Sequence, residues 1–279
     1  MESNSRAPSS SPGASASAKP KVGLDPAVSR ASAVRNDPAE APAKPKRRRP
    51  RPLPEGYIPR VAEVKDVPEI VDLMMQQAHA NGGRLGDLGR NFNRLMYQHF
   101  VESPHGLIVV MEAPDGRIAA MGTGLVSRPF FRDFLLKRSF IAAWAILPYA
   151  LNPKNLLRNA DTVWAALRYI PRSPNNDPPA ECTGMNTHGD FHRLGLGTHL
   201  FSFMVEQYKL QGYDCIKLGH IPVDNTRAIA YWESFGSYFV RTEPIYSGHL
   251  TRVYFYDLPE RTLVEEMHAL ADAEEAGDD

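Results

Sequence analysis

The chain has 279 residues, of which 43% are hydrophobic, so it is long enough to bury one substantial core. Its formal net charge is zero, which excludes a global electrostatic attraction to nucleic acid or to a membrane surface. Two cysteines exclude a disulfide framework, and the sequence shows neither a signal peptide nor a stretch apolar and long enough to cross a bilayer. We expect a soluble, cytoplasmic protein.

The two ends of the chain differ in composition from its middle. Residues 1–56 are rich in Ser, Ala, Pro and basic residues, and they cannot bury enough apolar surface to offset the entropy of ordering, so we expect a disordered tail. This tail ends in the basic run KPKRRRPRP at 44–52. The run fits a nuclear-import or nucleic-acid patch, but we favour the alternative, a solvated basic tail without a dedicated partner. Residues 259–279 form an acidic C-terminal tail.

Between the tails, the hydrophobic pattern predicts alternating strands and helices. In DVPEIVDLMMQQAHA, Asp66 is placed to cap a helix and Glu69 to complete a capping box. The tripeptide PDG at 114–116 predicts a hairpin turn. The expected strands cover 56–64, 107–113, 117–127, 181–187, 213–219, 237–241 and 250–257, and the expected helices cover 66–80, 87–102, 198–211 and 226–235.

A long apolar segment, at about 129–179, interrupts this alternation. It contains some forty helix-like residues and then the loop PRSPNNDPP. Connections of this length are functional or disordered, and this one is too apolar for disorder. We expect a helical insertion whose surplus aromatic residues wall a pocket for an anionic acceptor, with four cations beside them: Arg128, Arg132, Lys137 and Arg138. A membrane-surface role is the alternative. The element order predicts an α+β domain at 57–258, with this insertion before the fourth strand.

The stretch FHRLGLGTHLFSFM places Gly195 and Gly197 directly before a helix. A strand, a Gly-x-Gly turn and a helix together present free backbone amides and the positive end of a helix dipole, which suit a phosphate. A P-loop is excluded because Thr198 and His199 follow, where Lys and Ser or Thr are required. A dinucleotide-binding fingerprint is also disfavoured, because it requires a third glycine at the position of Leu200. A purely structural turn remains the alternative.

The downstream stretch IPVDNTRAIAYWESFGS resembles the second signature of the GNAT superfamily of acyl-CoA N-acyltransferases. In that pattern an Asn is followed by an Ala, an aromatic residue and a Gly at the helix end, here Asn225, Ala228, Trp232 and Gly236. The stretch HRLGLG resembles the Arg/Gln-x-x-Gly-x-Gly/Ala loop of the superfamily, with His192 in the first position. The resemblance covers roughly 57–128 and 180–257. It implies a GNAT-like fold, with a mixed, mostly antiparallel sheet flanked by helices.

The resemblance also implies a cofactor site. The loop amides would grip the pyrophosphate of acetyl-CoA, the co-substrate, and a splayed strand pair would receive its pantetheine arm. Amides of the fourth strand would polarise the thioester carbonyl. No metal is expected, because the spacing of the nearby Cys and His residues matches no standard site. The implied cofactor-binding residues are Met185, Asn186, Thr187, His192, Arg193, Leu194, Gly195, Leu196, Gly197, Thr198, Asn225 and Trp232.

Two residues are candidates for catalysis. In one branch of the superfamily a Glu six residues before the last position of the fourth strand is the base, and Glu181 lies six residues before Thr187. The alternative is that Glu181 is an exposed carboxylate at a strand start. The usual Tyr that protonates the CoA thiolate is Trp232 here, and an indole N–H cannot act as that acid. Either Tyr231 is recruited, or the thiolate leaves without a dedicated acid.

We therefore expect an acyl-CoA-dependent N-acyltransferase that transfers acetyl from acetyl-CoA to a primary amine by direct attack in a ternary complex. The amine must first lose a proton, because an alkylamine is mostly charged at neutral pH. A small-molecule acceptor is favoured, and a homodimer is left open. The alternatives are a catalytically idle acyl-CoA sensor and a nucleic-acid adaptor that binds through the basic tail.

Overall fold

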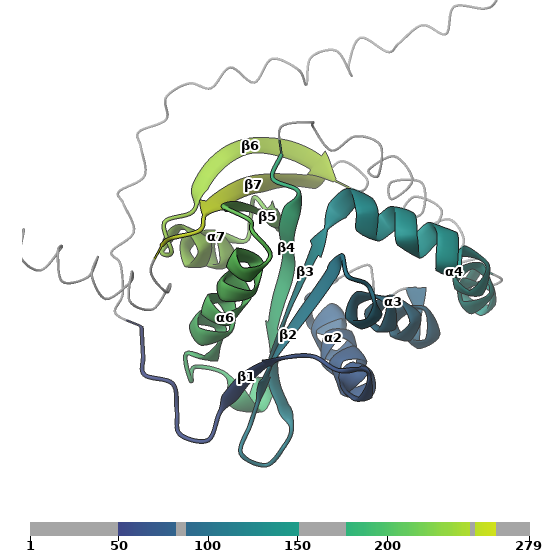
Figure 1. Ribbon diagram of the computed structural model, residues 1–279, viewed down its shortest axis with the longest axis horizontal. Helices are drawn as coiled ribbons and strands as arrows, with labels where there is room; N and C mark the ends of the chain where they lie inside the picture. The colour runs from purple at the N-terminus through teal and green to yellow at the C-terminus, as the bar shows by residue number, and fades with distance from the viewer. Residues whose placement is uncertain (1–49, 82–87, 151–176, 246–248, 261–279) are drawn as a thin grey trace, which may run out of the picture. The chain divides into compact units, whose positions relative to one another are not determined.

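A seven-stranded sheet with the order β1-β2-β3-β4-β5-β7-β6 forms the centre of the computed structural model (Figure 1). The structure describes residues 50–81, 88–150, 177–245 and 249–260, all within the unit Pro45–Asp279. Neighbouring strands are antiparallel except β4 and β5, which are parallel. The strands are β1 (Ile58–Val61), β2 (Gly106–Glu112), β3 (Ile118–Val126), β4 (Ala180–Thr187), β5 (Cys215–Pro222), β6 (Tyr238–Ile245) and β7 (His249–Asp257).

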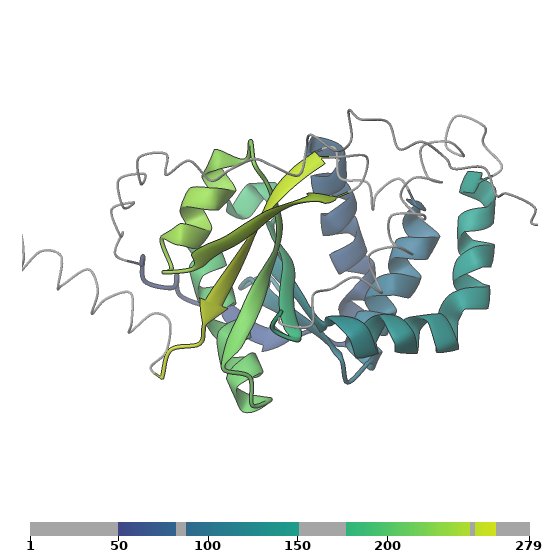
Figure 2. The same cartoon turned by 90° about the horizontal axis from the view of Figure 1, so that it is seen from above.

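Helices cover both faces of this sheet. Helices α6 (Leu196–Leu210) and α7 (Thr226–Glu233) lie on one face, and α2 (Val67–Asn81) and α3 (Arg90–Glu102) lie on the other (Figures 1 and 2). Strand β2, which lies between β1 and β3, therefore buries alternate side chains in two different cores, which explains its unbroken apolar sequence LIVVM. The elements predicted from the sequence are present, and their bounds differ from the expected ones by a few residues.

The predicted insertion begins with a single long helix, α4 (Ser127–Ala150), directly after β3. It packs against α3 through Phe130 and Phe134, while Phe140 is 82% exposed. Two of the cations expected to attract an anionic acceptor already have anionic partners. Arg138 pairs with Glu102, and Lys137 pairs with Asp133 at 2.8 Å. The remainder of the insertion, 151–176, lies outside the described residues, as does 261–279 of the acidic tail.

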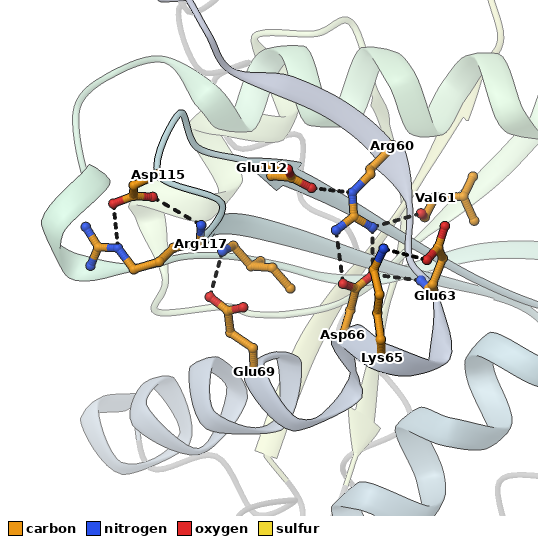
Figure 3. A network of polar contacts seen from close by, with 10 residues as sticks. Arg60, Val61, Glu63, Lys65, Asp66, Glu69, Glu112, Asp115 and Arg117 are labelled. Atoms are coloured by element: carbon orange, nitrogen blue, oxygen red, sulfur yellow. Dashed lines mark hydrogen bonds and ion pairs between the residues drawn. The ribbon is translucent and has the colours of Figure 1, made fainter.

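The start of α2 is organised differently from the capping box expected of Asp66 and Glu69 (Figure 3). A short 3₁₀ helix, η2 (Val64–Asp66), precedes α2, so the capping box lies three residues earlier: the Asp66 carboxylate accepts from the Glu63 amide at 2.7 Å. Glu69 instead accepts the Ile118 amide of β3 at 2.7 Å. The prediction for Glu69 was wrong because a tertiary partner takes its carboxylate. Arg60 joins Asp66 to Glu112, so ionic contacts connect β1, η2 and β2.

Candidate functional site

Strands β4 and β5 pair over a short distance and then diverge. In the described sheet they pair at Glu181↔Lys217 and Cys182↔Leu218. Gly219 lies at the point of divergence, where an added Cβ would come within 2.9 Å of the Cys182 carbonyl oxygen. Beyond this point β4 continues to Thr187 with β3 alone as its strand partner in the described sheet. The backbone of the predicted cofactor residues Met185, Asn186 and Thr187 therefore borders the divergence.

A tight turn joins η4 (Gly189–Phe191), which follows β4, to α6. Gly195 has a φ of 79°, which favours glycine, and Arg193 has a φ of 67°, which is unusual for a residue with a side chain. The Thr198 amide donates to the Gly195 carbonyl at 3.1 Å and closes the turn. Leu196 is buried in the core and Leu194 packs against it, so these side chains anchor the turn while its backbone forms the positive end of the α6 dipole.

Two polar side chains expected at the cofactor make contacts within the protein. His192 places Nε2 3.0 Å from the Thr187 carbonyl oxygen, so its ring connects the turn back to β4. Asn225 is the N-cap of α7, and its Oδ1 accepts from the Ala228 amide at 3.1 Å. Both residues thus have structural roles that hold the turn and the helix in place. Their contact with a cofactor remains a prediction.

The two aromatic candidates on α7 lie in different environments. Trp232 is 8% exposed and packs edge-on against Phe201 in the core under α6. Tyr231 directs its hydroxyl toward the glycine turn, 3.0 Å from where a Cβ on Gly197 would lie. That hydroxyl is buried and has no hydrogen-bond partner among the described residues. Burial also holds the pKa of Tyr231 far above its usual value. The structure therefore brings Tyr231, and not Trp232, to the turn.

A cluster of charged side chains lies on the opposite face of the sheet from α6. Glu181 and Lys217 project to this face because their neighbours along the strands, such as Cys182 and Leu218, are in the core under α6. The Lys217 ammonium lies 3.4 Å from the Glu181 carboxylate and 3.6 Å from that of Asp177. We call the following set the charge cluster: Asp177, Glu181, Lys217, His220, Arg241 and Glu243.

The charge cluster corrects one interpretation of Glu181. Glu181 is only 4% exposed and Lys217 only 2%, so Glu181 is not an exposed carboxylate at a strand start. The Tyr208 hydroxyl also donates to the Glu181 carbonyl oxygen at 2.9 Å, which fixes the backbone there. Lys217 was not among the residues predicted from the sequence. The signal was present, because Lys217 interrupts the apolar run of β5 between Ile216 and Leu218.

Arg241 and Glu243 extend the cluster onto β6. Arg241 binds Asp177 through two hydrogen bonds of 2.7 and 2.8 Å and also donates to Glu243 at 2.9 Å. His220 lies 3.2 Å from the same Glu243 carboxylate. Burial, and then the positive charge of Lys217, lowers the pKa of His220 to about 4, although Glu243 acts in the opposite direction. At neutral pH the His220 ring is therefore uncharged.

This lowered pKa predicts a pH dependence of stability. The folded state takes up a proton on His220 less readily than the unfolded state, whose pKa is close to 6.5, so stability falls as pH drops from 7 toward 4. Between pH 7 and pH 5 we expect the free energy of unfolding of the wild type to fall by about 2 kcal/mol more than that of His220→Gln. Urea unfolding at both pH values measures this difference. Parallel pH profiles for the two proteins would contradict it.

Comparison with known proteins identifies the class. The model of the acetyltransferase (GNAT) family matches residues 84–237, which is more than half of the chain. The chain belongs to the acetyltransferase (GNAT) family, and the predicted α+β fold, with its mostly antiparallel sheet, is confirmed. No curated protein matches the chain significantly. Of the described helices, none combines the length and apolarity that crossing a membrane would require.

Several solved structures are similar in fold at low sequence identity. A putative acetyltransferase from Salmonella typhimurium, solved with acetyl-CoA, is 14% identical over 74% of this chain and 96% of its own, with a TM-score of 0.47. The ribosomal-protein-S18-alanine N-acetyltransferase from Escherichia coli is 14% identical over 74% and 96%, with a TM-score of 0.44. An N-acetyltransferase from Staphylococcus aureus is 15% identical over 73% and 99%, with a TM-score of 0.45.

Proposed function

We propose that the chain is an acetyl-CoA-dependent N-acetyltransferase that acetylates a primary amine by direct attack in a ternary complex. The main observation that supports this proposal is the divergence of β4 and β5 after their short paired stretch. The glycine turn lies next to it on the α6 face, and the charge cluster lies next to it on the other face. A thioester passing between the two strands would thus be bound from one face and attacked from the other. Membership of the GNAT family supports the same reaction.

The coenzyme would be held mainly by backbone groups. Amides of the turn from Arg193 to Gly197, together with the α6 dipole, suit the pyrophosphate. The Thr198 hydroxyl would also donate a hydrogen bond to the pyrophosphate, while the Thr198 amide donates to the Gly195 carbonyl within the turn. The β4 backbone around Met185 would hold the pantetheine arm, and an amide there would stabilise the negative charge that develops on the thioester oxygen.

The charge cluster suits an acceptor that arrives as an ammonium ion. It contains three carboxylates and two permanent cations, and with His220 neutral its net charge is −1. We propose that Glu181 accepts the proton of the amine, because Glu181 lies closest along β4 to the divergence. The Lys217 ammonium lies 3.4 Å from this carboxylate. These charges favour a small cationic amine over the anionic acceptor expected from the insertion.

The chemical step then needs little more from the protein. Glu181 first accepts one proton of the ammonium ion and passes it to solvent, and the neutral amine nitrogen then attacks the thioester carbon. The carbon–sulfur bond breaks to release the CoA thiolate, and the nitrogen loses its second proton to Glu181. The Tyr231 hydroxyl lies beside Gly197 at the glycine turn, where it would meet the phosphate end of the coenzyme, so the thiolate would leave without a dedicated acid. The thiolate would be protonated by solvent after release.

Glu181→Gln tests the assignment of the base. The amide keeps the shape of the side chain but cannot accept the proton, so we expect turnover to fall about 100-fold, with the largest deficit at low pH, where little free amine is present. The dissociation constant for CoA should stay within about twofold, since the assigned phosphate contacts lie on the turn. CoA release over a pH series measures turnover, and calorimetry measures binding. Asp214→Asn, which alters an exposed carboxylate before β5, is the control.

A wild-type pH–rate profile for Glu181→Gln would remove Glu181 from the mechanism. An equal loss in Asp214→Asn would show that the effect of Glu181→Gln is not specific to the charge cluster.

The environment of α7 favours a second candidate, an acyl-CoA sensor that binds without turnover. Trp232 is packed in the core at the position where the superfamily pattern places an acidic Tyr, and burial raises the pKa of Tyr231, which makes its hydroxyl a weaker acid. Release of CoA thiol distinguishes the sensor from the N-acetyltransferase. A sensor would bind CoA and acetyl-CoA but release no CoA thiol with any member of a broad panel of amines.

A further inference from the structure

The last residues before β1 lie against the glycine turn. The Arg51 guanidinium donates through Nη1 to the Arg193 carbonyl at 2.5 Å, and the Arg51 carbonyl oxygen lies 2.8 Å from Nε2 of His199 on the first turn of α6. Leu53 and Tyr57 then pack against the core under α6. This segment belongs to the tail in composition, yet it is attached to the domain at the predicted phosphate site.

The shape of the turn accommodates Arg51. A Cβ added to Gly195 would lie 3.2 Å from the Cβ of Arg51, closer than ordinary side-chain contacts, so a glycine here lets the tail segment approach. Arg193 keeps a left-handed backbone that costs of order 1 kcal/mol for a residue with a side chain. Its carbonyl is the group that accepts the Arg51 guanidinium.

The surroundings of the turn suit an anion. The first turn of α6 carries no acidic residue, and the side chains of Arg51 and Arg193 are both exposed. His192 is turned back to the Thr187 carbonyl oxygen. The buried Tyr231 hydroxyl next to Gly197, which has no partner among the described residues, is an independent sign that a polar ligand group belongs here.

We propose that Arg51 is a phosphate ligand of coenzyme A, supplied to the turn by the N-terminal tail. This inference rests on the proposed function. Arg51 uses one of its five N–H donors on the Arg193 carbonyl, and a phosphate would offer it a charged, bidentate partner in place of a neutral one. On binding, the guanidinium turns from the carbonyl to the phosphate, and the segment from Pro50 to Leu53 covers that part of the coenzyme.

The test is calorimetry of the full-length chain with CoA and with 3′-dephospho-CoA. Arg51→Ala should raise the dissociation constant for CoA about 5- to 10-fold, within the range of an exposed charge-assisted contact. Arg51→Lys should recover part of the loss, because it keeps the charge without the planar fork. Arg94→Ala, which removes an exposed arginine on α3 across the sheet, should leave affinity unchanged. Thermal unfolding without ligand verifies that each variant is folded.

Comparison of CoA with 3′-dephospho-CoA shows which phosphate group Arg51 contacts. A loss that persists with 3′-dephospho-CoA assigns Arg51 to the pyrophosphate, and a loss confined to CoA assigns it to the 3′-phosphate. Equal or tighter binding of CoA by Arg51→Ala, in a protein whose wild type binds CoA, would overturn the inference and leave the proposed function standing. Absence of CoA binding by the wild type would overturn the proposed function and this inference together.

Discussion

Gly197→Val is expected to weaken CoA binding at least about 100-fold, because a branched side chain at the start of α6 would displace two or more phosphate contacts worth about 1.5–3 kcal/mol each. An added Cβ at this position also approaches the Tyr231 hydroxyl to 3.0 Å, the far end of a side chain that can move. The folded state should therefore lose much less free energy than the complex. Calorimetry with CoA and urea unfolding of the free protein measure the two effects.

Gly189→Ala is the matched control for that variant. Gly189 begins η4, close to the turn in sequence, and an added Cβ there meets no atom within 4 Å. Its CoA affinity should equal that of the wild type. A folded Gly197→Val protein that binds CoA as tightly as Gly189→Ala would exclude the turn as the phosphate site.

Lys217→Met is expected to have the largest effect on stability. It removes the buried cation that lies beside Glu181 and Asp177, and removing one partner of a buried ion pair typically costs about 3–5 kcal/mol. Urea unfolding at pH 7 measures the loss. The control Lys209→Met deletes a partly exposed lysine that pairs with Glu206 along α6, and it should cost less than about 1 kcal/mol.

A double variant separates charge from packing. Adding Glu181→Gln to Lys217→Met removes the carboxylate that has lost its cation, so the double variant should be more stable than the sum of the single effects predicts. Strict additivity would mean that Lys217 acts through its packing and not through Glu181. A single variant Lys217→Met within about 1 kcal/mol of the wild type would contradict a net stabilising role for the charge cluster.

The fold was largely predictable because local patterns agree with the tertiary structure. The HRLGLG turn and the helices that follow it, α6 and α7, are local features, and each occurs where the sequence indicated. The capping box at Asp66 and Glu69 was misplaced because Glu69 finds a partner on β3, 49 residues away in sequence. A tertiary contact overrode a local preference there.

The positions of the candidate residues along the strands and the glycine turn could be predicted from the sequence, but most of their side-chain contacts could not. The position of Glu181 along β4 made it a candidate, but its burial beside Lys217 depends on the pairing of β4 with β5, a strand much later in the sequence. The contact of Arg51 with Arg193 spans 142 residues, so composition alone assigned Arg51 to a solvated tail. Such contacts follow from the topology and leave no local pattern.

The central claim is that the divergence of β4 and β5 holds an acyl thioester for attack by an amine. The most direct measurement is release of CoA thiol from acetyl-CoA by the full-length wild-type protein, with a panel of small cationic, neutral and anionic primary amines. We expect amine-dependent release with 1:1 formation of the N-acetylated amine, fastest for a cationic acceptor and greatly reduced in Glu181→Gln. Tight binding of acetyl-CoA with no amine-dependent release across the panel would contradict it.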